Sequence, residues 1–195
     1  MVISDDGLQH YALNRDIEIA VIDGERGVGN GRLLPSGPLR EPISRLSEVD
    51  WVVSNGSCDT DLGVSFHQMC AVVEAFVSLS SGRRLSPSEF SDLAGNRLIA
   101  LAGIGNPMRF KTTLETMGFG VQFVAFDDHH EYKESDIRDM PAGPIVVTEK
   151  DAEKIRALKV SKKREIWYAE IAMTFDPSVD EILTNKFSKI GLALK

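Results

Sequence analysis

Carboxylates and histidines gather at two places where a short apolar run ends. Asp5 and Asp6 follow apolar residues 2–3 after a single serine, Ser4, and the segment 127–130 (Asp-Asp-His-His) follows another apolar run. Ligands of open α/β sheets bind at the carboxyl ends of strands, where phosphoryl-transfer enzymes use an acid to hold magnesium. Asp5 and Asp6 are therefore candidate magnesium ligands. The alternative, which a bare Asp-Asp-Gly favours, is a turn-capping aspartate followed by a solvated one.

The segment 127–130 is the densest cluster of titratable groups in the chain and holds two of its four histidines. A neighbouring aspartate can orient an imidazole and raise its basicity, as proton transfer in catalysis requires. A metal site would need further ligands that this spacing does not supply. The segment therefore predicts proton-transfer chemistry, with a solvent-facing polar loop as the alternative.

Residues 24–42 form a segment rich in Gly, Pro and Arg that has no hydrophobic period. Its arginines, Arg26, Arg32 and Arg40, could bind phosphate oxygens in pairs, and its glycines would let backbone amides approach such a group. The sequence contains neither a Gly-x4-Gly-Lys-Ser/Thr phosphate loop nor a Gly-x-Gly-x-x-Gly dinucleotide fingerprint. The segment predicts an anion site of another kind, or else an arginine-bearing surface loop with turn glycines.

Two strand-to-helix junctions could bind an anion or could simply cap a helix. The first is the segment 103–107 (Gly-Ile-Gly-Asn-Pro), in which Asn106 is the expected N-cap and Pro107 the first helical residue. Arg109 would reinforce anion binding there. The second is the segment 148–151 (Thr-Glu-Lys-Asp), for which capping by Thr148 is the stronger interpretation.

Short apolar runs and helical patterns alternate along the chain and must position these segments. Strands are expected over residues 17–23, 49–55, 98–102, 121–126, 145–148 and 166–171. Helices are expected over residues 42–48, after Ser86-Pro87, and over residues 107–117, 149–158 and 179–190. Strands alternating with helices are typical of a parallel sheet with helices on its faces, so the predicted fold class is α/β.

Composition excludes several other classes of protein. The chain has 195 residues, of which 43% are hydrophobic and 26% charged, as in a soluble globular protein. No apolar run approaches the roughly 20 residues of a membrane-spanning helix. The net charge of −7 gives no support to nucleic-acid binding. Cys58 and Cys70 form no zinc or disulfide pattern and are expected to be reduced thiols.

The first residues look like the end of a strand. The β-branched pair at positions 2–3 is followed, after one serine, by Asp5 and Asp6, whereas a strand usually needs about five or six residues. We therefore expect the first half of this strand to be missing.

Together these segments resemble the tetraacyldisaccharide 4'-kinase family, the lipid A 4'-kinases of Gram-negative bacteria. The strings that carry the resemblance are Ser4-Asp5-Asp6-Gly7-Leu8-Gln9-His10-Tyr11, Gly29-Asn30-Gly31-Arg32-Leu33-Leu34-Pro35 with Gly37-Pro38-Leu39-Arg40-Glu41-Pro42, Ala102-Gly103-Ile104-Gly105-Asn106-Pro107, Asp128-His129-His130 and Thr148-Glu149-Lys150-Asp151-Ala152. Five motifs in the family's order make the resemblance specific.

The resemblance implies transfer of the γ-phosphate of ATP, with Mg2+, to the 4'-hydroxyl of the tetraacyl disaccharide 1-phosphate precursor of lipid A. The reaction would take place at the cytoplasmic face of the inner membrane. It also implies a P-loop-kinase-like parallel sheet, of which residues 1–68 would be the C-terminal part. An extended linker over residues 69–96 and a smaller α/β domain over residues 97–195 would follow, with the active site in the cleft between the domains.

The resemblance also implies roles for particular residues. Asp5 and Asp6 would be the acids near magnesium, and Gln9 and His10 would line the same cleft. The arginine- and glycine-rich segment, with Asn30, Arg32 and Arg40, would face the phosphate-bearing disaccharide. Asp128 and His129 would orient or activate the general base, with His130 as the alternative to His129.

The resemblance implies that the phosphate loop, an acidic residue thought to act as base, and the membrane-associating helix belong to an N-terminal half, which we expect this chain to lack. Transition-state charge then has no stabiliser, so we expect the chain alone to be inactive. The alternative is a non-catalytic binding remnant that retains a surface for a phosphosugar or nucleotide. A dinucleotide-binding protein is disfavoured, because residues 103–107 lack the third glycine.

Overall fold

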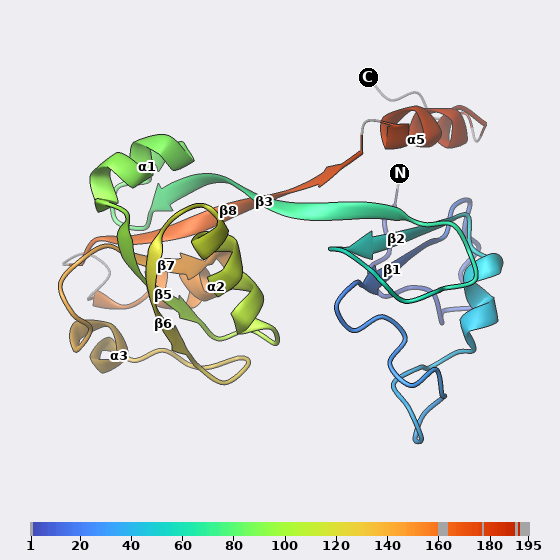
Figure 1. Ribbon diagram of the computed structural model, residues 1–195, viewed down its shortest axis with the longest axis horizontal. Helices are drawn as coiled ribbons and strands as arrows, with labels where there is room; N and C mark the ends of the chain where they lie inside the picture. The colour runs from blue at the N-terminus through green and yellow to red at the C-terminus, as the bar shows by residue number, and fades with distance from the viewer. Residues whose placement is uncertain (1, 160–163, 177, 190, 192–195) are drawn as a thin grey trace. The chain divides into compact units, whose positions relative to one another are not determined.

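The computed structural model describes residues 2–159, 164–176, 178–189 and 191 (Figure 1). Contacts divide the chain into two units. Unit 1 comprises Met1–Ala71 and Met173–Lys195, and unit 2 comprises Val72–Ala172. The domain boundaries expected from the resemblance, residues 1–68, 69–96 and 97–195, stay a prediction. Two long strands, β3 (His67–Ser78) and β8 (Ile166–Phe175), have residues in both units.

Unit 1 is built on parallel strands with a helix beside them. Strand β1 (Ile19–Asp23) pairs with β2 (Trp51–Asn55), which pairs with the start of β3, and both pairings are parallel. Between β1 and β2 the chain runs out from the sheet as a loop and returns through the 3-10 helix η1 (Ile43–Ser47) (Figure 1). Helix α5 (Ser178–Lys189) buries Val179 in one cluster with Trp51 and Val53.

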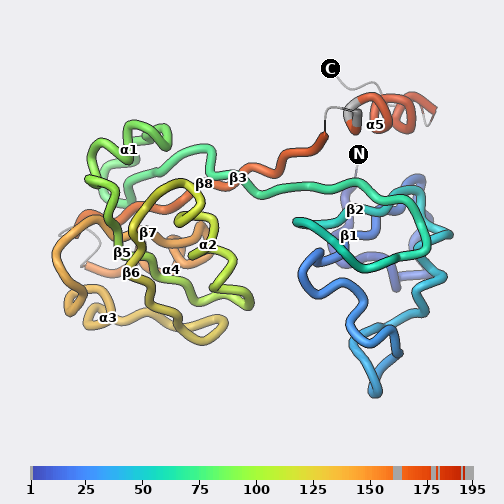
Figure 2. The backbone as a smooth tube through the Cα atoms, viewed as in Figure 1, coloured from blue at the N-terminus to red at the C-terminus, as the bar shows by residue number. Residues whose placement is uncertain are grey.

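Unit 2 contains the larger part of the sheet, in the order β3-β8-β7-β5-β6, with β4 (Arg84–Leu85) antiparallel to β3. Strand β5 (Arg97–Ala102) pairs in parallel with β6 (Gly120–Ala125) and β7 (Ile145–Thr148), and β7 pairs in parallel with β8. The helices are α1 (Pro87–Ala94), α2 (Pro107–Thr116), α3 (Glu134–Arg138) and α4 (Glu149–Arg156). The backbone path between them is traced in Figure 2.

Three helices of unit 2 begin at the side chains that the sequence marks as caps. Ser86 and Glu89 form a reciprocal capping box at α1, Asn106 accepts from the Arg109 amide at α2, and Thr148 accepts from the Asp151 amide at α4. These caps satisfy amide groups that a helix start leaves without partners. The caps Asn106 and Thr148 therefore fix where a helix begins after the carboxyl ends of β5 and β7.

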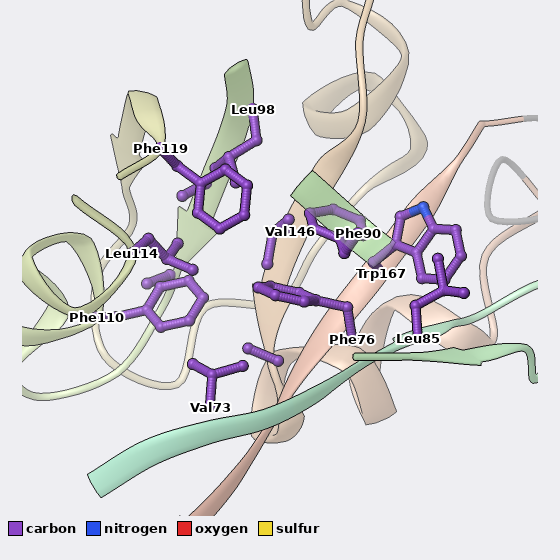
Figure 3. Packing of buried hydrophobic residues seen from close by; sticks show 13 residues of the cluster. Val73, Phe76, Leu85, Phe90, Leu98, Phe110, Leu114, Phe119, Val146 and Trp167 are labelled. Atoms are coloured by element: carbon purple, nitrogen blue, oxygen red, sulfur yellow. The ribbon is translucent and has the colours of Figure 1, made fainter. Parts of the chain in front are cut away.

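Aromatic rings form the main core of unit 2. Phe76 and Phe90 lie one over the other at a centroid distance of 4.0 Å, and Trp167 meets Phe90 edge-on at 5.3 Å (Figure 3). Phe119 packs edge-on against both phenylalanines. Together with aliphatic residues of β5 and α2, these rings hold α1 and α2 against the sheet.

The structure confirms the α/β fold class and the parallel sheet. The expected strands and helices form, but their ends differ: the segment 42–48 is a short 3-10 helix, and the last strand continues to Phe175. Ile190, the expected end of the last helix, lies outside the described residues. None of the described helices is long and apolar enough to cross a membrane.

The strand end expected at residues 2–4 is not formed. The chain there is irregular, and the side chains of Val2 and Ile3 are exposed. A strand needs a neighbour that accepts and donates its backbone hydrogen bonds, and no described strand pairs with these residues. Apolar, β-branched composition alone therefore does not make a strand here.

Replacing Phe90 by alanine should destabilise unit 2 by about 3–5 kcal/mol, because it leaves a cavity among buried rings. Leu93→Ala on the same helix is the matched control, since Leu93 is largely exposed, and its cost should be well below 1 kcal/mol. Urea unfolding followed by Trp167 fluorescence in a Trp51→Phe background reports on unit 2 alone. Equal costs for the two variants would contradict the proposed core.

Candidate functional site

The segment that follows Asp5 and Asp6 is held in place by one arginine. Arg15 Nη1 donates to the carbonyl oxygens of Gly7 at 2.5 Å and Leu8 at 3.2 Å. Its other terminal nitrogen lies 2.7 Å from Glu18 Oε1. Because Glu18 directly precedes β1, this arginine ties an irregular segment to the edge of the sheet.

Glu18 is the centre of a larger ionic cluster in unit 1. Arg45 of η1 donates to Glu18 at 2.8 Å and lies 3.5 Å from both Glu41 and Glu48. The hydrogen bond to Glu18 raises the pKa of Arg45, so the guanidinium stays ionised. Glu41 also raises the pKa of Tyr11 by a side-chain hydrogen bond. The cluster thus connects the segment after Asp6, strand β1 and η1.

Three of the expected site residues meet in unit 1. Arg40 Nη1 lies 3.5 Å from Asp6 Oδ2 and donates to Gln9 Oε1 at 3.4 Å. Asp6 is 85% exposed at its side chain and has a left-handed backbone with φ of 52°. Asp5 and His10 are also exposed. The group is therefore an open surface on which one guanidinium contacts a carboxylate and a side-chain amide.

Asn30 shapes the arginine- and glycine-rich loop. Its amide nitrogen donates to the Ser36 carbonyl at 2.9 Å, and its oxygen accepts from the Arg32 amide at 3.1 Å. A Cβ on Gly37 would overlap that oxygen and the carbonyl oxygen of Arg32, so the loop needs glycine there. Asn30, expected to face the substrate, has both ends of its amide engaged within the loop. Arg32 and Arg40 therefore lie on a loop whose backbone conformation is fixed by hydrogen bonds of Asn30.

Asp128 and His129 lie in unit 2, on the loop after β6. The His129 amide donates to Asp128 Oδ1 at 3.0 Å, and His129 Nε2 lies 3.8 Å from Asp128 Oδ2. The His129 ring is 90% exposed, and its backbone is left-handed with φ of 61°. The structure therefore brings the expected Asp–His pair together at the carboxyl end of a strand, with the imidazole facing outward.

His130 has the opposite surroundings. Its ring stacks on Phe126 at a centroid distance of 4.4 Å and meets Tyr132 edge-on at 4.9 Å. Its Nε2 lies 3.0 Å from Asp136 Oδ2. The Lys133 amide, and then His130, hold the pKa of Asp136 below its usual range.

A buried carboxylate lies under the same strand ends. Asp151 Oδ2 accepts from the Gly103 amide at 3.0 Å and from the Thr148 hydroxyl at 2.7 Å. Asp151 Oδ1 and the Tyr132 hydroxyl are buried without a hydrogen-bond partner in the described part of the chain. Burial, followed by the charge of Asp151, raises the pKa of Tyr132, which stays neutral.

Sequence reasoning missed Asp136 and Tyr132 and assigned Asp151 only to capping. The signal for Tyr132 was present, because it is the only large aromatic residue in the polar segment after Phe126. No local pattern marks Asp136, whose contact with His130 depends on the turn between them.

The carboxylates of Asp5 and Asp6 could hold a hard cation such as Mg2+, and this stays a prediction. Within the described residues no group of three or more His, Cys, Asp and Glu side chains could hold a metal ion. Asp5 and Asp6 supply two hard carboxylates, and Mg2+ commonly takes one or two carboxylates and completes its shell with water and phosphate. Cys58 and Cys70 are both free thiols, as expected.

Comparison with known proteins gives consistent matches. A family model described as Tetraacyldisaccharide-1-P 4'-kinase matches residues 1–188. The tetraacyldisaccharide 4'-kinase of Pseudomonas fluorescens is 46% identical over 179 residues, which are 91% of this chain and 50% of the relative. That of Stutzerimonas stutzeri is 50% identical over 80% of this chain and 46% of the relative. The chain spans about half the length of these relatives.

One solved structure shares the fold. LpxK from Aquifex aeolicus, crystallised in complex with ATP, superposes with a TM-score of 0.69 at 24% identity. The match covers 95% of this chain and 56% of the other. The likeness agrees with the kinase-like α/β fold class expected from the sequence.

Asp151→Ala should destabilise unit 2 by about 2–3 kcal/mol, because the Gly103 amide and the Thr148 hydroxyl lose a buried acceptor. Glu153→Ala on the same helix is the control, since its side chain is exposed, and it should change stability by no more than about 0.5 kcal/mol. Urea unfolding followed by Trp167 fluorescence measures both. Similar midpoints for Asp151→Ala and the control would show that the buried acceptor is dispensable.

Asp136 should make unit 2 more stable above its unfolded pKa of about 3.9. Its folded pKa is lowered, so this contribution is present at neutral pH and is lost as pH falls through the folded pKa. Asp136→Asn should therefore lower the urea midpoint at pH 7, and the gap to the parent chain should narrow below about pH 4. Asp139→Asn, an exposed neighbour, should show no such pH-dependent gap; a gap for Asp136→Asn that is constant with pH would contradict this assignment.

Proposed function

Because this chain belongs to the tetraacyldisaccharide 4'-kinase family, we propose that it contributes to transfer of the γ-phosphate of ATP to the 4'-hydroxyl of a tetraacyl disaccharide 1-phosphate. The observation that carries the proposal is the match of the family model over residues 1–188. The contact of Arg40 with Asp6 and Gln9 supports it, because it joins residues from two of the motifs. The reaction would occur at the cytoplasmic face of the inner membrane, where such a lipid is accessible.

In unit 1, Asp5 and Asp6 would hold Mg2+. The ion, when bound, neutralises charge on phosphate oxygens. Arg40 already lies beside Asp6 and would bind a phosphate oxygen through its remaining N–H groups. Arg32 is exposed on the same loop and would add a second guanidinium. Gln9 orients Arg40 through its side-chain oxygen, and exposed His10 would contact the sugar.

In unit 2, His129 would help remove the proton of the attacking hydroxyl by orienting or activating the general base. Its ring is exposed and lies beside an exposed carboxylate, Asp128. An adjacent carboxylate can orient the imidazole, and an exposed ring can reach a substrate hydroxyl, as proton transfer requires. His130, stacked and hydrogen-bonded, is less accessible for that step.

The chain alone should not catalyse the transfer. Its sequence holds no Gly-Lys phosphate loop to bind the β- and γ-phosphates. Among the described strands β1 pairs only with β2, and Val21 on β1 is 58% exposed. An open, apolar strand edge readily accepts another strand. We therefore propose that the part of the family's length not matched here supplies the phosphate loop and pairs with β1.

The test measures phosphate transfer from labelled ATP to tetraacyl disaccharide 1-phosphate. The purified chain alone should give none, and co-expression with the unmatched half of the Pseudomonas fluorescens relative should give activity. In that complex Asp6→Asn and Arg40→Gln should each lower kcat/KM by roughly 100-fold or more, as expected for lost charge stabilisation. Arg83→Gln, an exposed arginine of unit 2, is the matched control and should leave activity unchanged.

Two outcomes would overturn the proposal in different ways. Transfer by the chain alone would refute its dependence on the part of the family's length that is not matched here. No transfer by the complex, together with retained binding of the phosphosugar by the chain, would favour a non-catalytic binding protein instead.

A further inference from the structure

The adjacent histidines after β6, His129 and His130, have different surroundings and, in this inference, different roles. We propose that His130 is a positioning residue: its partly buried imidazole fixes the loop that presents Asp128 and His129 to solvent. The inference rests on the proposed function in one respect, that His129 takes part in proton transfer.

The two imidazoles differ in every contact. The His129 side chain is 90% exposed, and its nearest carboxylate oxygen lies 3.8 Å away. The His130 side chain is 27% exposed and lies 3.0 Å from Asp136 Oδ2. A ring that serves as a mobile acid or base needs access to substrate, whereas a ring packed and hydrogen-bonded on several sides gives rigidity. The exposed ring of His129 is therefore suited to proton transfer, and the packed ring of His130 is suited to holding the loop in place.

His130 connects both ends of the loop. Its amide donates to the Asp127 carbonyl at 3.0 Å, which closes a turn around positions 128 and 129. Its ring stacks on Phe126, which ends the strand side of the loop, and meets Tyr132 on the helix side. The loop is thus clamped around one imidazole.

Asp136 holds this clamp to the following helix. Its Oδ2 accepts from the Lys133 amide at 2.9 Å and also faces His130 Nε2. One carboxylate therefore fixes both the start of α3 and the orientation of the imidazole. The contact requires no charge on His130, because a neutral ring can donate from Nε2.

Tyr132 anchors the clamp to the sheet. A Cβ on Gly103 would lie 3.1 Å from the Tyr132 hydroxyl and 3.3 Å from Asp151 Oδ1, so both oxygens face the end of β5. Asp151 is itself bonded to the Gly103 amide. His130 contacts Tyr132, and the Tyr132 hydroxyl lies near Gly103 after β5 and near Asp151. Asp151 in turn bonds Thr148, the last residue of β7, so these contacts connect the loop to the ends of both strands.

The fixed loop explains how His129 keeps an unfavourable backbone. A non-glycine residue in the left-handed region persists only where its surroundings hold it, and His129 has a φ of 61° with an exposed side chain. Its own ring makes no buried contact that could hold it there. The restraint must come from its neighbours, and His130 is the neighbour with buried contacts.

The first experiment measures backbone ¹⁵N order parameters of Asp128 and His129 in the full 195-residue chain. Both should be near 0.85 in the parent chain and should fall below about 0.6 in His130→Ala and in Asp136→Asn. His130→Gln, which keeps an N–H donor toward Asp136, should restore most of the order. Asp139→Asn, an exposed carboxylate at the end of the same helix, is the matched control and should change nothing.

The second experiment measures kinetics in the complex with the unmatched half of the Pseudomonas fluorescens relative. His130→Ala should lower kcat by roughly tenfold or more without changing KM for the lipid, because the reacting group is misplaced rather than the substrate released. His130→Gln should recover most of that loss. Urea unfolding followed by Trp167 fluorescence confirms that each variant is folded under assay conditions.

Each result bears on one claim. Unchanged order in folded His130→Ala, or disordered loops with unchanged kcat, would refute the positioning role. If the parent complex shows no phosphate transfer, the proposed function fails, and the order parameters still decide whether His130 fixes the loop.

Discussion

Parallel pairing of strands is the constraint on which the rest of this structure depends. Because β5 pairs in parallel with β6 and β7, the chain leaves all three strands at one edge of the sheet. Residues 103–106, residues 127–132 and Thr148 therefore meet, although they are far apart in the sequence. Asp151, in the first turn of α4, is then close enough to bond both Gly103 and Thr148. An antiparallel arrangement would send neighbouring strand ends to opposite edges and would leave these contacts unmade.

Charge is divided between buried groups that hold the chain and exposed groups that can react. Asp151 and Asp136 both accept backbone amides, in addition to their contacts with the basic side chains of Lys154 and His130. The backbone amide of Glu18 and Lys186 similarly lower the pKa of Asp50 in unit 1. By contrast, Asp6 and the imidazole of His129 face solvent. A reacting group must change its charge or partner during the reaction, so it cannot also be the group that holds the fold.

Local patterns in the sequence predict the elements well but predict the contacts between them poorly. Ser86, Asn106 and Thr148 mark helix starts because a cap is a contact within three residues. The density of acids and imidazoles at residues 127–130 indicates a site for the same local reason. Which imidazole points outward depends on a turn and on Phe126, and periodicity contains no such information. The return of Val179 to pack with Trp51 depends on a contact between residues more than a hundred positions apart. The role of Asn30 as a substrate ligand, which the family resemblance implies, stays a prediction, and no local pattern indicates that its amide also bonds within the loop.

Backbone strain points to the same residues as the charges do. Among the described non-glycine residues, positive φ occurs at Asp6, Asn96 and His129. Asn96 follows the left-handed Gly95 that ends α1, so helix termination explains its conformation. Neither Asp6 nor His129 ends a helix, and both side chains are exposed, so burial does not favour their conformations either. Strain of this kind persists where the surroundings impose it and is concentrated at functional sites.

In unit 1 the restraint comes from Arg15 and its bonds to Gly7 and Leu8. In unit 2 it comes from the turn closed by the His130 amide. Two unrelated restraints therefore present an acid and an imidazole to solvent, which is the arrangement that the proposed metal binding and proton transfer would need.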